Sequence, residues 1–170
     1  MTDSDRLSFL TKIYPHAKRV ESETGFNSVA MMAQACGECG WEEPPGNMYF
    51  GVKSFKETDN RQLIRTKEIL DRPDVKFPVI HSITPIGNKF KYDIEDWFMK
   101  YDSPYESFRD HARFVTENKR YSKALEVKDN PVLFLTELAK AGYATGENYA
   151  QFMTDMVKSV EIRLKKLSLT

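Results

Sequence analysis

The sequence lacks an excess of charge of either sign, because 25 Lys and Arg residues balance 25 Asp and Glu residues. A net charge of zero argues against a general nucleic-acid binder, which carries a basic excess, and against a polybasic protein of the membrane surface. Aromatic residues make up 12% of the chain, which is not the composition of a disordered protein. We therefore expect a folded protein whose partners include neither nucleic acid nor a membrane.

Cysteine is also scarce, with 2 in 170 residues, so a disulfide scaffold is excluded. Cys36 and Cys39 form one C-x-x-C pair near the end of a predicted helix. A redox pair would favour a helix N-terminus, and a zinc site would need further ligands, so both thiols are expected to pack as small apolar groups. The three histidines are scattered, and no phosphate-binding, dinucleotide-binding or serine-hydrolase motif is present. No metal and no organic cofactor is predicted.

No apolar run is long enough to cross a bilayer, and from the polar, acidic N-terminus we expect no signal peptide. The length predicts a single domain over residues 1–170. We expect this domain to be a monomer that is synthesised in the cytoplasm.

Helical periodicity dominates the N-terminal part of the chain. Apolar residues recur at helical spacing over 7–20, with Asp3 or Ser4 as the N-cap and Pro15 predicting a kink or the start of a second helix. The next segment, 28–39, is apolar nearly all round, which is typical of a buried helix.

Helices return in the C-terminal part. Ser103 and Asn130 each precede a proline, and a cap followed by proline opens a helix. These helices are expected to end near Asn118 and Gly142, and a last helix to begin near Asn148.

Between these helices the periodicity changes to short extended runs, with Gly87-Asn88 as a tight turn. The sequence thus predicts an α+β protein: a mostly helical lobe with a small β lobe inserted at about residues 54–98.

Glu38 is the most suggestive residue for chemistry. It lies in the apolar helix, near its C-terminal end, and both burial and the negative end of the helix dipole disfavour a carboxylate anion. A carboxyl group that keeps its proton is what a general acid requires, whereas the simpler interpretation is a glutamate on the exposed stripe of the helix.

A second carboxylate is the natural partner of a general acid in glycoside hydrolysis, and spacing alone does not choose it. The β-rich part offers Glu57, Asp59, Glu68, Asp71, Asp74, Asp93, Glu95 and Asp96. Aromatic rings suited to sugar faces lie in loops or near helix ends, although packing is the simpler role for any one of them. They include Trp41, Tyr49, Tyr143 and Tyr149.

Six sequence blocks, in this order, resemble the bacterial cell-wall glucosaminidases of glycoside hydrolase family 73. The first block, Ala33 to Trp41, resembles the A-Q-A-x-x-E-[ST]-G-W signature that carries the family's catalytic acid. The other blocks are Asn47-Met48-Tyr49-Phe50-Gly51-Val52-Lys53, Thr66-Lys67-Glu68, Tyr101 to Phe108, Asn118 to Tyr121, and Gly142-Tyr143-Ala144-Thr145 followed by Tyr149-Ala150. Departures include Cys39 for a hydroxyl residue and Gly37 for a bulky aliphatic one.

The resemblance implies a lysozyme-like fold with a glycan groove between the two lobes. It implies cleavage of the β-1,4 bond after N-acetylglucosamine in peptidoglycan, with Glu38 as general acid, Glu68 as second carboxylate and Tyr143 supporting catalysis. The same resemblance and the aromatic pattern suggest substrate-binding roles for Trp41, Asn47, Tyr49, Phe50 and Tyr149.

Two kinds of alternative stay open from the sequence. One is a muramidase or lytic transglycosylase on the same fold, and the other is a catalytically silent wall-binding domain. Because peptidoglycan lies outside the cytoplasm, a phage endolysin is the expected setting, acting on the wall after release through lysis; an injected effector and an excised domain of a secreted protein are the alternatives.

Overall fold

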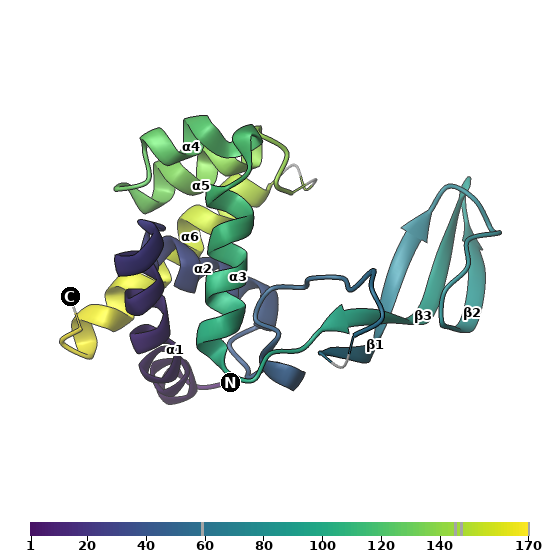
Figure 1. The fold of residues 1–170 in the computed structure, drawn as a ribbon, viewed down its shortest axis with the longest axis horizontal. Coiled ribbons are helices and arrows are strands. Elements are labelled where there is room, and N and C mark those ends of the chain that lie inside the picture. The colour runs from purple at the N-terminus through teal and green to yellow at the C-terminus, as the bar shows by residue number, and fades with distance from the viewer. Residues whose placement is uncertain (59, 145, 147, 170) are drawn as a thin grey trace. The chain divides into compact units, whose positions relative to one another are not determined.

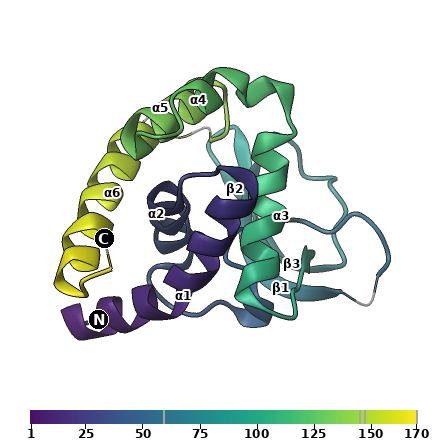
Figure 2. The same cartoon turned by 60° about the vertical axis from the view of Figure 1, so that its left-hand side comes forward.

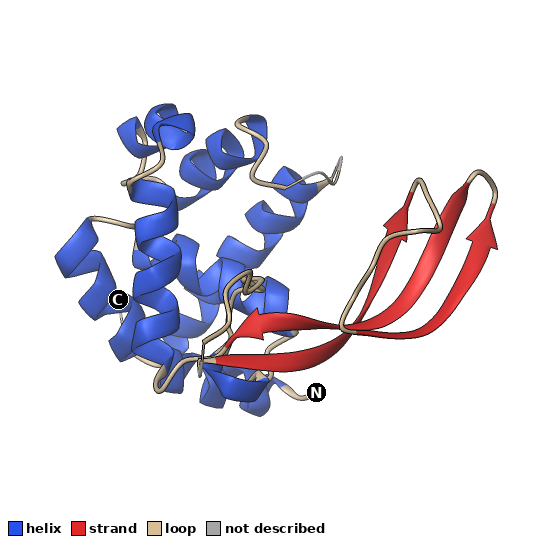
Figure 3. Ribbon diagram, turned by 45° about the vertical axis from the view of Figure 1, so that its right-hand side comes forward, coloured by secondary structure: helices blue, strands red, loops and turns tan. Residues whose placement is uncertain are grey.

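The computed structural model describes residues 1–58, 60–144, 146 and 148–169. Asp59 and Thr145, which the sequence analysis named, lie outside the described residues. The chain divides into two compact units, a helical unit of residues 1–50 and 102–170 and a sheet unit of residues 51–101. Their helices and strands are distinguished by colour in Figure 3.

The helical unit contains the α-helices that were predicted and some short ones that were not. The longer helices are α1 (Asp3–Thr24), α2 (Ser28–Cys39), α3 (Pro104–Thr116), α5 (Pro131–Lys140) and α6 (Tyr149–Lys166). The shorter elements are η1 (Pro45–Asn47), η2 (Lys119–Tyr121) and α4 (Ser122–Glu126) (Figure 1).

Helix α2 lies in the middle of this unit, in contact with α1, α5 and α6 (Figure 2). Its run from Ala30 to Cys36 is buried, which confirms the buried helix predicted from its composition. Asn27 caps its N-terminus through its side-chain oxygen, and Gly40 ends it with a φ of 61°. Gly37 faces α6 closely: a Cβ at this position would lie 2.9 Å from Met153 Cε and 3.0 Å from Phe152 Cε1.

Helix α1 differs from its prediction in two ways. Its N-cap is Thr2, not Asp3 or Ser4, because Thr2 and Asp5 form a reciprocal capping box. Pro15 lies inside one continuous helix, so the alternative that it starts a second helix is wrong. The predicted caps of α3 and α5 are confirmed, since Ser103 and Asn130 each accept a backbone hydrogen bond from the first turn.

The sheet unit contains a three-stranded antiparallel sheet in the order β1-β3-β2. The strands are β1 (Arg61–Leu70), β2 (Val79–Ile86) and β3 (Lys89–Met99). The long β3 pairs with both neighbours, from Arg61↔Met99 to Leu70↔Phe90 on one side and from Val79↔Glu95 to Ile86↔Lys89 on the other. The predicted tight turn after Ile86 is confirmed, with Gly87 at a φ of 59°. The α+β fold with a small inserted sheet is therefore confirmed.

Candidate active site

Glu38 lies in the last turn of α2, as the sequence predicted. Its side chain reaches the surface, but the protein around it displaces enough water to raise the pKa of its carboxyl above the usual range. Among the described residues, no hydrogen bond or ion pair involves this carboxylate. Glu38 is thus an exposed residue of α2, as the simpler interpretation of the sequence expected, and partial desolvation without a compensating cation favours the protonated form of its carboxyl.

Two tyrosines lie within the electrostatic field of Glu38. Burial raises the pKa of Tyr143, and the negative charges of Tyr149 and Glu38 add to the rise. Burial likewise raises the pKa of Tyr149 to about 12; the hydrogen bond with Gln34 opposes this rise, and the charge of Glu38 adds to it. The two phenol rings lie 6.0 Å apart, and the charge of Glu38 acts on both, so the structure places these three predicted site residues in one region of the helical unit.

Gln34 and His111 form a polar connection beneath these tyrosines that the sequence analysis did not predict. Gln34 Nε2 lies 3.1 Å from Tyr149 Oη, and Gln34 Oε1 lies 2.9 Å from His111 Nε2. The signal for Gln34 was available: it is the polar residue in an apolar run and precedes Glu38 by four residues, on the same helix face. The signal for His111 was its place after the Tyr101–Phe108 block, but only tertiary packing reveals its partner.

The chain turns sharply after Glu38, at Gly40 and Trp41. Trp41 has a φ of 67°, a left-handed conformation that costs a non-glycine residue about 1 kcal/mol or more. Its ring is buried against Phe9, with the guanidinium carbons of Arg6 and Arg163 5.4 and 5.2 Å from its centroid. The packing of the Trp41 ring holds this turn in place.

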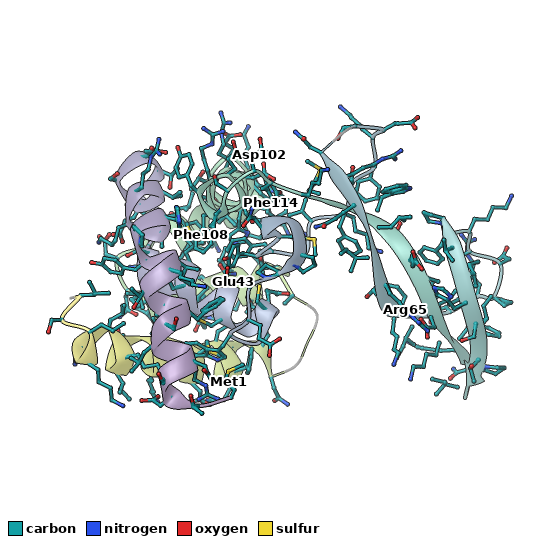
Figure 4. All side chains as sticks on the ribbon, turned by 90° about the horizontal axis from the view of Figure 1, so that it is seen from below. Met1, Glu43, Arg65, Asp102, Phe108 and Phe114 are labelled. Carbon is teal, nitrogen blue, oxygen red and sulfur yellow. The ribbon has the colours of Figure 1, made fainter. Side chains whose placement is uncertain are left out.

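The other predicted substrate-binding residues follow this turn. Tyr49 and Phe50 are buried and pack their rings against Phe108 of α3, with ring centroids 5.3 Å apart. Phe108 is labelled in Figure 4, within the helical unit. Asn47, like Trp41, has a left-handed backbone, with a φ of 51°. In this arrangement Trp41, Tyr49 and Phe50 pack within their own unit, and their contact with a glycan stays a prediction.

Glu68 lies on β1 in the sheet unit, in an environment unlike that of Glu38. Lys53 Nζ lies 2.8 Å from Glu68 Oε1 and 3.1 Å from Asp96 Oδ2, so one ammonium group links two carboxylates. The sequence analysis missed Lys53 as the partner of Glu68, although Lys53 ends the second family block. Glu68 lines an open hollow of about 390 Å³ in the sheet unit. Its other lining residues are Lys53, Leu70, Asp71, Arg72, Val75 and Phe77.

The described residues contain neither a cluster of metal-binding side chains nor a membrane-spanning helix. Among them, His, Cys, Asp and Glu side chains form no cluster of three or more that could hold a metal ion. In the same part of the chain, the helices are too short or too polar to cross a membrane.

Comparisons with known proteins give a consistent result. A family model described as glucosaminidase, mannosyl-glycoprotein endo-beta-N-acetylglucosaminidase, matches residues 14–162. The peptidoglycan hydrolase FlgJ of Vibrio cholerae is 29% identical over 171 residues, which cover 96% of this chain and 45% of that protein. FlgJ of Pseudomonas aeruginosa is 27% identical over 164 residues, covering 90% and 36%. The chain thus spans less than half the length of these two relatives.

Solved structures share the fold. The glycoside hydrolase domain of Salmonella typhimurium FlgJ superposes with a TM-score of 0.67 at 24% identity, covering 96% of this chain and 92% of that one. A peptidoglycan hydrolase mutant from Sphingomonas sp. A1 gives 0.69 at 22% identity, covering 94% and 99%.

Proposed function

The chain belongs to the glucosaminidase family, and from this premise we propose that it is a glycoside hydrolase of peptidoglycan. The bond cut is the β-1,4 bond after N-acetylglucosamine, and the substrate is the glycan strand of the bacterial cell wall. The family match over residues 14–162 and the similarity to the FlgJ peptidoglycan hydrolases support this assignment.

The environment of Glu38 is the observation that carries the proposal. A raised pKa, with no ion pair among the described residues, favours the protonated form of Glu38, which is the form that a general acid requires. Glu38 gives this proton to the glycosidic oxygen as the bond to the anomeric carbon breaks, and Glu38 becomes a carboxylate. Tyr143 and Tyr149 lie beside it as hydrogen-bonding groups for the sugar.

Glu68 is the proposed second carboxylate. An ion-paired carboxylate suits two tasks: accepting a proton from the attacking water, or stabilising positive charge on the sugar ring. In the alternative mechanism the acetamido group of the substrate attacks the anomeric carbon, and then Glu68 is dispensable for bond cleavage.

The test is digestion of purified peptidoglycan by the wild type and by Glu38→Gln, followed by borohydride reduction and mass spectrometry of the products. We expect reduced N-acetylglucosaminitol ends from the wild type and none from Glu38→Gln. Reduced muramitol ends would make the protein a muramidase, and anhydro-muramic ends a lytic transglycosylase. Wall binding by the folded wild type without any cleavage would make it a binding domain.

The remaining expectations concern assembly and delivery. We propose that the domain acts as a monomer on the cell wall, which sedimentation analysis tests. Release from the cytoplasm by phage lysis, or delivery by injection, stays a prediction.

A further inference from the structure

We infer that a buried hydrogen-bonded chain, His111–Gln34–Tyr149, fixes the direction in which the Tyr149 hydroxyl donates its hydrogen. In the reaction proposed above, on which this inference rests, Tyr149 donates to a sugar oxygen beside Glu38. His111 and Gln34 are then positioning residues that do not touch the substrate.

Three helices contribute one residue each to this chain. His111 on α3 and Gln34 on α2 are buried, with 3% and 1% of their surface exposed, while Tyr149 at the start of α6 is half-buried. The two distances, 2.9 Å and 3.1 Å, are those of ordinary hydrogen bonds. A glutamine this deeply buried must satisfy its amide inside the protein. His111 and Tyr149 are two of its partners, and Tyr143 is a further hydrogen-bond partner of the Gln34 side chain.

His111 sets the direction at the buried end. Burial lowers the pKa of its imidazole to about 3, so the ring is neutral near pH 7 and carries one N–H. The ring stacks on Phe50 at 3.8 Å, which fixes its plane. Gln34 Oε1, which lies 2.9 Å from Nε2, is an amide oxygen and can only accept a hydrogen bond. The hydrogen therefore belongs on Nε2, which donates to Gln34 Oε1.

Gln34 transmits this hydrogen-bond direction from His111 to Tyr149. Its oxygen is engaged by His111, so its NH₂ group faces Tyr149 and donates to Oη. The phenol oxygen accepts in this bond, so the O–H hydrogen of Tyr149 is left for another acceptor.

That hydrogen lies close to the site of chemistry. Glu38 follows Gln34 by one helical turn on the same face of α2, and its charge acts on Tyr149. A donor whose direction is set before the substrate arrives loses little entropy on binding a sugar oxygen.

The first experiment measures the tautomer without any substrate. Long-range ¹H–¹⁵N correlation spectra of the imidazoles should show His111 as the neutral Nε2–H form from pH 8 down to about pH 4. The Nδ1–H form, or a charged ring at pH 6, would overturn the hydrogen-bond direction.

The second experiment measures kcat and KM on soluble peptidoglycan fragments. Tyr149→Phe and Gln34→Met should each lower kcat by about tenfold with KM changed by no more than about twofold, because each removes one directed donor. The kcat of the double variant should lie within about twofold of the kcat of Tyr149→Phe, since both changes interrupt the same hydrogen-bonded chain. If the two losses in kcat multiply in the double variant, the residues act independently, and the inference is contradicted.

Two substitutions of His111, one that keeps a hydrogen-bond donor and one that does not, test its positioning role. Glutamine at 111 can place an NH₂ donor where Nε2 stands, whereas methionine cannot, so His111→Gln should retain most of the kcat that His111→Met loses. Val115→Ala, one turn further along α3 and also buried, controls for general loosening of the core. Equal losses in both His111 variants, or a loss in Val115→Ala that matches them at equal Tm, would assign His111 a purely structural role.

These measurements also separate this inference from the proposed function. A wild type that leaves peptidoglycan intact would overturn the proposed function and the donor role of Tyr149. The tautomer, read without substrate, would still decide whether the buried chain has the direction inferred.

Discussion

The helical unit and the sheet unit place their proposed catalytic carboxylates in opposite surroundings. In the helical unit, partial burial raises the pKa of Glu38, and no cation among the described residues offsets it. In the sheet unit, Glu68 is held by Lys53, which also contacts Asp96. Different environments give chemically identical groups different roles, here a proton donor and an ion-paired carboxylate.

The two units also differ in how they are held together. Most buried apolar side chains belong to the helical unit, whereas those of the sheet unit, within the described residues, are Tyr92, Ile94 and Phe98. Several large apolar side chains of the sheet are exposed instead, among them Ile69 at 60%. A three-stranded sheet with so small a core depends more on hydrogen bonds and ion pairs, and is expected to open at a lower free energy than the helices.

The largest expected difference between the two carboxylates is in their effect on activity. Glu38→Gln removes the proton donor and should lower kcat by about 10³-fold, whereas Glu68→Gln should lower it by about 10²-fold or less. The wild-type rate should fall on the alkaline side at a pH above 4.5, the ordinary pKa of a glutamate, because the pKa of Glu38 is raised. Initial rates from pH 4 to 9 check both expectations, and an equal or larger loss in Glu68→Gln would reverse the assigned roles.

Acid should weaken the helical unit through His111. Its pKa is about 3 in the folded protein against 6.5 in the unfolded chain, so its stabilising effect is complete above pH 6.5 and is lost as the pH falls toward 3. The loss should reach several kcal/mol, because a fully buried imidazole takes up no proton while the unfolded one does.

Trp41 provides the readout for this effect. Since the chain has 2 tryptophans, Trp97→Phe leaves Trp41 as the reporter of the helical unit. Urea unfolding of this variant at pH 7, 5.5 and 4 should show the decline, and His111→Gln in the same background should flatten it. An unchanged slope in the His111 variant would assign the decline to other groups.

Removal of the shared cation should affect the sheet alone. Lys53→Met leaves Glu68 and Asp96 without their common ammonium and should lower the local stability of the sheet by about 1 kcal/mol, since all three groups are partly exposed. Faster hydrogen exchange of β1 and β3 amides, with α2 unchanged, is the expected result. Arg65→Met, which removes an exposed ion pair with Asp93, is the matched control and should have a smaller effect.

The smallest expected effect is that of Glu38→Gln on the stability of the helical unit. A raised pKa means that the folded protein favours protonated Glu38, so stability is lost as the pH rises through that pKa. Glu38→Gln, which is always neutral, should therefore raise Tm slightly at pH 7 and leave it unchanged at pH 4. The exposed Glu42→Gln is the control, and a Tm gain of equal size in it would remove Glu38 from the explanation.

Features set by neighbouring residues could be predicted from the sequence. The caps at Ser103 and Asn130, the buried helix α2 and the position of Glu38 near its end depend on residues a few positions apart, and the structure has all of them. The N-cap of α1 was misplaced because several polar residues compete there, and only the geometry selects Thr2.

Partnerships across the fold could not be predicted in the same way. Gln34 meets His111 across 77 positions and Tyr149 across 115, and Lys53 meets Glu68 across 15. No local pattern encodes these distances, because helix and strand packing sets them. The resemblance to the family supplied Glu68 and Tyr143, but not the groups that hold Glu68 or underlie Tyr149.

The close approach of α2 to α6 at Gly37 has a consequence for the evolution of this site. Met153 and Phe152 occupy the space that a side chain at 37 would need, so positions 37 and 153 share one volume between them. A larger residue at 37 would force the end of the Met153 side chain and the ring of Phe152 on α6 to move aside, unless residue 153 became smaller at the same time. The two positions are therefore expected to change together among descendants of this chain, a larger side chain at one accompanying a smaller side chain at the other.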